Sequence, residues 1–324
     1  MPERKISRRI LLARLGLVAL ICLCLRIGPS EIFQTLASLG WQGFLIITGS
    51  HLVIVMLRAM AWRGVWPAMP VLALFRARLV RNAVADCLPF SPSSGLAIAA
   101  RVIVSQNRAG RLLAMTAATL DAAIHLATQL LFISIGLMFL ACSLGNMPSA
   151  RVAIAALAAA AFAGFIVMAM FYRTRGFHID LLAKIRSGQS HEDALLNTML
   201  ADLFSGRCGL LRAGGCHFLA CLAMSVQTLL ILKMLGQNVG LKSALGIEAL
   251  VMLVRTAAFS LPAAIGLQEA AYLFVAAMLG VPTLPAIALA LLQRARDLTI
   301  GVPVLCWWRA AHGSAWLGPR SHFI

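Results

Sequence analysis

Residues 112–140, LLAMTAATLDAAIHLATQLLFISIGLMFL, decide the fold class of this protein. A helix that crosses a bilayer needs roughly 20 consecutive apolar residues, and this stretch is longer and carries one acid, Asp121. Over the whole chain, 61% of residues are hydrophobic and only 12% are charged, whereas soluble globular domains have about 25% charged residues. The sequence therefore predicts an all-α polytopic integral membrane protein and excludes a soluble enzyme, a disordered regulator and a disulfide-stabilised secreted domain.

Apolar segments of membrane length recur along all 324 residues. About seven or eight membrane helices are expected, from the segments 10–25, 41–61, 112–140, 153–171, 216–235, 241–261, 263–278 and 284–308. The long polar stretch 172–212 predicts a cytoplasmic amphipathic loop. The organisation is therefore a single membrane domain, residues 1–324, without room for a separate catalytic domain.

The net charge is +17, from 28 Lys and Arg against 11 Asp and Glu. The basic residues lie mainly between apolar segments, where the positive-inside rule places them on the cytoplasmic side. We interpret the dense basic stretch from Arg58 to Arg111 in this way, and we expect a cytoplasmic N-terminus and no nucleic-acid partner. The eight cysteines form no CxxC pair, and neither a disulfide, a metal site nor a cofactor is expected.

Two further stretches are apolar but interrupted. Residues 80–101 read VRNAVADCLPFSPSSGLAIAAR, and residues 253–271 read LVRTAAFSLPAAIGLQEAA. Proline ends a regular helix, and irregular backbone at membrane depth requires surrounding protein or a watery cavity. In both stretches an arginine precedes Leu-Pro and a glycine follows. Paired interruptions of this kind predict two re-entrant segments in a pseudo-repeat around a central binding site.

Charged side chains inside the membrane are costly and need a partner or a cavity. Asp121 and His125 stand four residues apart and share one helix face; they suit either helix–helix hydrogen bonding or the handling of a ligand or proton. Glu269 follows the second break, with arginines available to pair with it. His51 and His217 are expected to be interfacial.

These considerations give a candidate substrate-binding set and no catalytic residue. The set comprises Asn82, Asp86, Pro89, Ser91, Gly95, Arg101, Asp121, His125, Arg255, Pro262, Gln268, Glu269, Arg294 and Arg296.

Two motifs carry a resemblance to a known family. The pattern N-x5-LPF-x4-G-x5-R, from Asn82 to Arg101, and SLPAAIGLQEAAY at Ser260–Tyr272 are similar to the flippase-like membrane domain of lysylphosphatidylglycerol synthases. Within that superfamily the chain most resembles hopanoid-biosynthesis-associated membrane proteins, over roughly residues 10–310. Relatives tend to carry Gly-Glu after the first break, where this chain has Gly95-Leu96. Residues 1–324 contain no stretch that resembles the synthases' soluble aminoacyl-transferring domain, and we do not expect that chemistry here.

The resemblance implies a multi-pass protein of the bacterial inner membrane that moves or handles lipids. Our leading hypothesis is lipid translocation or export, with a hopanoid or related isoprenoid lipid as cargo and membrane lipids as partners. Two alternatives remain open. One is a membrane-embedded enzyme acting on a lipid head group, for which Asp121, His125 and Arg101 could supply the chemistry. The other is a non-catalytic scaffold that gathers lipid-biosynthesis enzymes. We expect no enzymatic activity.

Overall fold

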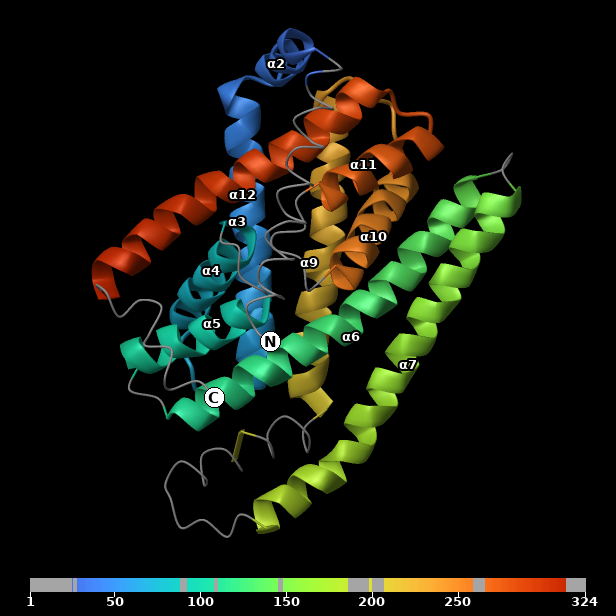
Figure 1. Cartoon of the computed structure of the whole chain (residues 1–324). Helices are drawn as coiled ribbons and strands as arrows, with labels where there is room; N and C mark the ends of the chain where they lie inside the picture. The colour runs from blue at the N-terminus through green and yellow to red at the C-terminus, as the bar shows by residue number, and fades with distance from the viewer. Residues whose placement is uncertain are drawn as a thin grey trace, which may run out of the picture.

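Figure 1 shows the computed structural model, which describes residues 25, 28–87, 92–107, 110–144, 148–185, 198–199, 207–258 and 266–312. The regular secondary structure of these residues is entirely helical. The helices are α2 (Pro29–Ser38), α3 (Gly40–Val65), α4 (Val71–Cys87), α5 (Pro92–Asn107), α6 (Arg111–Ser143), α7 (Pro148–Ile185), α9 (Arg207–Met234), α10 (Leu241–Ala257), α11 (Leu267–Met278) and α12 (Thr283–His312). The segment predicted at 10–25 lies outside the described part of the chain, apart from Leu25.

Four of the described helices are long and apolar enough to cross a bilayer. They are α3, α6, the part of α7 at Pro148–Met170, and the part of α9 at Gly209–Met234. The prediction of an all-helical membrane protein is confirmed at this level. Helix α7 lies along α6 at the edge of the bundle (Figure 1). It continues to Ile185, so the first residues of the predicted loop 172–212 are helical.

Each predicted interruption separates two short helices. Helices α4 and α5 have 17 and 16 residues, and α10 and α11 have 17 and 12. At 1.5 Å per residue, the longest of these measures about 26 Å, less than a hydrocarbon core of about 30 Å. The two helices of each pair pack together. At Gly95 they approach so closely that a Cβ atom would lie 3.0 Å from the carbonyl oxygen of Arg81.

The helix contacts follow a two-fold pattern that relates α3–α6 to α9–α12. Helix α3 packs against its counterpart α9. The long helix of each half packs against the first short helix of the other half, because α6 contacts α10 and α12 contacts α4. The pairs α3–α4, α4–α5 and α5–α6 likewise have counterparts in α9–α10, α10–α11 and α11–α12. This pattern is that of two repeats with the same helix order.

The two repeats have opposite orientations. Gly43 near the start of α3 lies against Met234 at the end of α9, while Gly64 near the end of α3 lies against Ala213 near the start of α9. The two helices are therefore antiparallel, as Figure 1 also shows. Small residues at such crossings let membrane helices approach closely without a strong hydrophobic driving force.

Candidate functional site

A cavity of about 290 Å³ lies where α3, α6, α9 and α10 meet. We call it the central cavity, and its lining residues are Arg58, Ala122, His125, Leu126, Gln129, Met224, Met252, Arg255 and Thr256. The two arginines come from different repeats, Arg58 from α3 and Arg255 from α10. The Gln129 side chain on α6 donates a hydrogen bond to the Thr256 hydroxyl on α10 at 2.8 Å, which links these two helices at the cavity. The cavity combines two guanidinium groups with methionine and leucine side chains.

The central cavity adjoins the place where the first short helices of the two repeats converge. Near the end of α10, an Arg255 Nη atom lies 3.5 Å from a carboxylate oxygen of Asp86 near the end of α4. The Arg255 side chain is 34% exposed and that of Asp86 is 20% exposed. The Arg255 guanidinium is therefore held by a long ion pair and remains accessible to a further anion.

A largely buried ionic cluster lies next to the cavity. The Asp121 carboxylate on α6 pairs with Arg78 at 2.7 Å, with Arg81 at 3.5 Å and with Nε2 of His217 at 3.0 Å. We call these four residues the Asp121 cluster. Removing charges from water is expensive unless they are paired and hydrogen-bonded, and here a single carboxylate lies among several cationic groups. The cluster joins α4, α6 and α9.

Arg58 connects the Asp121 cluster to the central cavity. Arg78 donates to the backbone carbonyl of Arg58 at 3.3 Å, and its guanidinium lies 5.6 Å from the ring centroid of Trp62. Arg58 itself donates to the Met224 sulfur at 2.9 Å. Arg58 and Arg78 both lie within helices, and Arg78 is only 2% exposed, so its charge is in the interior of the bundle. That the stretch from Arg58 to Arg111 lies on the cytoplasmic side stays a prediction.

The histidines also differ from expectation. His217 is fully buried and His51 is 8% exposed, so the prediction that both are interfacial is wrong. The ring of His217 lies 4.7 Å from that of His125, centroid to centroid, at an interplanar angle of 43°. His125 is therefore adjacent to the Asp121 cluster through His217, and it lines the cavity on its other side.

Both carboxylate oxygens of Glu269 take part in contacts that hold helices in place. One carboxylate oxygen accepts the backbone N–H of Gly266 at 2.7 Å and caps α11. The other accepts from Arg294 on α12, at 3.1 Å from Nε and 2.8 Å from Nη2. Gly266 has a φ of +82°, which glycine adopts without strain. Among the arginines that the sequence made available to Glu269, Arg294 is the one that pairs with it, and the pair joins the second break to α12.

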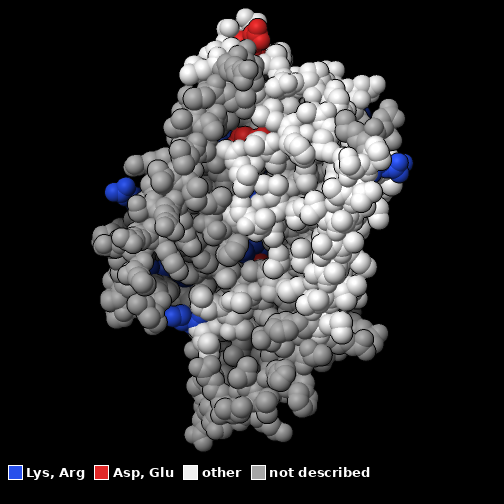
Figure 2. Space-filling view, turned by 45° about the vertical axis from the view of Figure 1, so that its right-hand side comes forward, with Lys and Arg blue, Asp and Glu red and all other residues white. Residues whose placement is uncertain are grey.

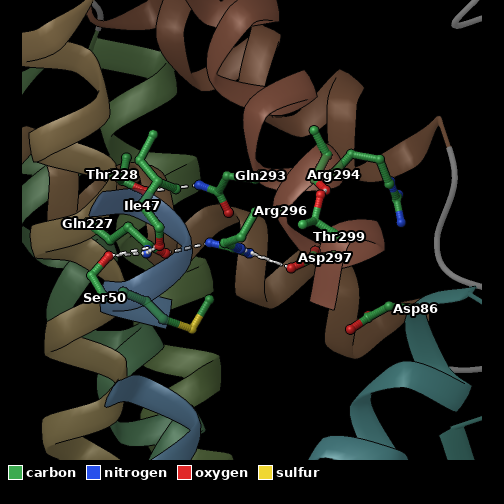
Figure 3. A network of polar contacts seen from close by, with 12 residues as sticks. Ile47, Ser50, Asp86, Gln227, Thr228, Gln293, Arg294, Arg296, Asp297 and Thr299 are labelled. Atoms are coloured by element: carbon green, nitrogen blue, oxygen red, sulfur yellow. Dashed lines mark hydrogen bonds and ion pairs between the residues drawn. The ribbon is translucent and has the colours of Figure 1, made fainter. Parts of the chain in front are cut away.

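Arg296 belongs to a separate polar network between α3, α9 and α12 (Figure 3). It pairs with Asp297 on its own helix at 2.7 Å and donates a short hydrogen bond to the Gln227 side-chain oxygen. Gln227 in turn donates to the Ile47 carbonyl at 2.7 Å and to the Ser50 hydroxyl at 2.6 Å. These side chains are fully engaged with one another and fix α12 against the α3–α9 pair.

A second buried acid forms a cluster that the site prediction omitted. Glu248 on α10 is 1% exposed, and one of its oxygens accepts from Thr228, from Tyr272 at 2.9 Å and from Gln293 at 3.3 Å. Glu248 was recognisable in the sequence only as an acid within an apolar run. Its partners lie on three other helices, and no local pattern could indicate them.

The structure thus brings together part of the predicted set. His125 and Arg255 line the central cavity, with Asp86 and Asp121 next to them. Glu269, Arg294 and Arg296 belong to the neighbouring networks described above. Asn82, Gly95, Arg101 and Gln268 form no ion pair or hydrogen bond that joins them to the cavity in the described part of the chain. Pro89, Ser91 and Pro262 lie outside the described residues.

The described part of the face in Figure 2 consists mainly of uncharged residues. A few acidic and basic atoms are visible in recesses near its middle, and others protrude at its edges. The cavity-lining Leu126 is 36% exposed. Since α6 is a candidate membrane helix, an exposed leucine beside the cavity would face lipid.

The comparison with protein families supports a membrane protein of lipid-related function. The model of the family described as "Lysylphosphatidylglycerol synthase TM region" matches residues 9–304. The chain matches no curated protein and no solved structure.

Proposed function

The chain belongs to the family of the lysylphosphatidylglycerol synthase TM region, and we propose that it moves a lipid between the leaflets of the bacterial inner membrane. The central cavity would hold the polar head group while the apolar tail stays in the bilayer. A hopanoid or related lipid is the proposed cargo, with phospholipids as the other class. The family match supports a membrane protein of lipid-related function, and the step from there to translocation is our proposal.

The observation that carries the proposal is the pair of arginines in the central cavity. Guanidinium groups bind phosphate oxygens through a planar fork of N–H donors, and Arg58 and Arg255 approach the cavity from opposite repeats. Methionines on the same wall suit the first carbons of an acyl or isoprenoid chain. The exposed Leu126 at the rim offers a path from the lipid phase.

The arrangement of the helices supports the same reading. We propose that α4–α5 and α10–α11 are re-entrant hairpins that enter from opposite sides, since each half begins with a long helix and the two long helices are antiparallel. Inverted repeats that meet at irregular segments near the midplane are typical of secondary transporters. The N-terminus is proposed to be cytoplasmic.

The test is a lipid-translocation assay with purified protein in vesicles that carry fluorescent phospholipid or hopanoid analogues in one leaflet. Arg58→Gln and Arg255→Gln are expected to reduce the rate at least tenfold, because each removes a charge from the cavity. Arg63→Gln is the matched control, since Arg63 lies on α3 but is exposed. Unchanged rates in both cavity variants, at normal protein level, would contradict the proposal and favour a scaffold.

An enzymatic role is the second candidate, and one observation favours it. His217 lies 3.0 Å from Asp121, and an oriented imidazole is the usual general base in proteins. We nevertheless propose that the protein is not an enzyme, because His217 is fully buried and does not line the cavity. Head-group product formed by the purified protein, and lost in Asp121→Asn and His125→Ala, would reverse this choice.

A further inference from the structure

Two imidazole rings stand between the central cavity and the Asp121 carboxylate. His217 uses Nε2 to contact the Asp121 carboxylate, and its ring packs against that of His125, which lines the cavity. The Nδ1 atoms of both histidines are buried and have no hydrogen-bond partner among the described residues. A buried polar atom without a partner costs free energy, so the His125 Nδ1 atom is a place where a ligand or a proton would restore a missing interaction.

Positively charged side chains from several helices surround His125. Arg58 faces it from α3, and Arg78 and Arg81 face it from α4. On the remaining sides are His217 from α9 and Arg255 from α10, whose own acid is Asp86. Asp121, one turn earlier on α6, is the acid of this group, and Arg78, Arg81 and His217 already share it.

An anion in the central cavity would change this balance. It would contribute negative charge beside His125, at the place where arginines from two repeats otherwise leave an excess of positive charge. Charges interact more strongly in a protein interior of low polarisability than they do in water. An imidazolium can donate from both ring nitrogens, so a protonated His125 could also provide a hydrogen bond to a phosphate oxygen.

We propose that His125 is a proton-binding site, and that an anionic lipid head group and one proton enter the central cavity together. The inference rests on the proposed lipid-binding function and deepens it by naming a co-substrate. Binding coupling is reciprocal: the head group favours protonation of His125, and protonation favours the head group. Loss of the proton on the side of higher pH then promotes release of the lipid, which gives the transport a direction.

The experiment measures binding of dihexanoyl phosphatidylglycerol to the full chain in nanodiscs of a zwitterionic lipid, between about pH 5 and 8, where histidine titrates. The phosphodiester keeps a single negative charge over this range, so a change of affinity with pH belongs to the protein. Calorimetry in two buffers of different protonation enthalpy counts the protons taken up. The variants are His125→Gln, His51→Gln as the matched buried histidine outside the cavity lining, and Arg58→Gln.

For the wild type and His51→Gln we expect the affinity for the lipid to fall by up to about tenfold for each unit of rising pH. Binding of one lipid should be accompanied by the uptake of nearly one proton by the protein. His125→Gln should bind with little dependence on pH. Two results would overturn the proton site and leave the lipid site intact. One is wild-type binding that is independent of pH, and the other is a His125→Gln variant that retains the full pH dependence. Absence of binding at every pH would overturn both, and loss of binding in Arg58→Gln alone would support the lipid site.

Discussion

Replacing Asp121 by Asn is the sharpest test of the buried ionic cluster. Asn keeps the volume and one oxygen, but it removes the negative charge that holds Arg78 at 2.7 Å and Arg81 at 3.5 Å. Both arginines would stay in place because α4 is packed between α3, α5 and α12. The variant therefore leaves guanidinium charges in the bundle without a carboxylate, with Asp121's own position completely buried.

The magnitude follows from the burial of the partners. Removing one member of a buried ion pair typically costs 3–5 kcal/mol, roughly, because the other charge remains uncompensated. Arg78 is 2% exposed and gains only partial relief from the Trp62 ring and the Arg58 carbonyl. Arg81 is 18% exposed and can reach water more easily. We therefore expect a loss of about 3–5 kcal/mol, dominated by Arg78.

Denaturant titration in mixed micelles would measure the free energy of unfolding, with Glu248→Gln as the matched control. Glu248 is equally buried, but its hydrogen-bond partners among the described residues are the neutral groups of Thr228, Tyr272 and Gln293. A glutamine retains the accepting oxygen, so this variant should lose only about 1–2 kcal/mol. The reasoning is refuted if Asp121→Asn costs no more than Glu248→Gln. If it is right, adding Arg78→Gln to Asp121→Asn recovers part of the loss.

Two further predictions concern the breaks. Glu269→Gln should lower the free energy of unfolding by about 1–2 kcal/mol, because it weakens the cap of α11 and the contact with Arg294; thermal unfolding checks this, and an unchanged midpoint contradicts it. Gly95→Ala should cost about 1–3 kcal/mol by pressing a Cβ against the Arg81 carbonyl. Gly215→Ala on α9, where no atom lies within 4 Å of the added Cβ, serves as its control and should lose nothing in the same measurement.

Much of the fold could be predicted from the sequence, because membrane segments depend on local composition. Long apolar runs gave the helices that include residues 41–61 and 112–140, and Pro89 and Pro262 marked the two places where helices end and restart. The repeat could be predicted only as a pair of interruptions. Its contacts, α6 with α10 and α12 with α4, depend on helix packing far apart in the chain, and hydropathy contains no information on which long helix meets which short one.

The candidate site was predicted less completely. Asp121, His125 and Arg255 stood out as ionisable residues in apolar runs, and the structure places them at or beside the cavity. Arg58 and Arg78 were missed because an arginine within or beside an apolar run has the same sequence signature whether it faces the cytoplasm or an interior. His217 was missed for a related reason, since its partner Asp121 is 96 residues away. The sequence signal that could have identified such an arginine is its position one helical turn away from the apolar face of its helix.

The two repeats share their helix arrangement but carry different charges at equivalent positions. The polar groups on the two sides of the central cavity therefore differ, although the helices around it are arranged almost symmetrically. Arg78 and Glu248 are each the eighth residue of α4 and α10, and Asp121 and Gln293 are each the eleventh of α6 and α12. In the first repeat these positions form an ion pair at 2.7 Å, whereas in the second they form a hydrogen bond at 3.3 Å.

Small residues at the helix crossings, such as Gly136 against Leu245 and Gly246 against Leu140, can maintain the repeat geometry without any of these charges. A buried ion pair generally adds little stability over well-packed apolar side chains. The Asp121 cluster is therefore poorly explained by stability alone. A role in binding better explains why the protein buries these charges, because charged residues within membrane segments typically mark substrate and ion pathways. Arg58 links the cluster to the wall of the central cavity.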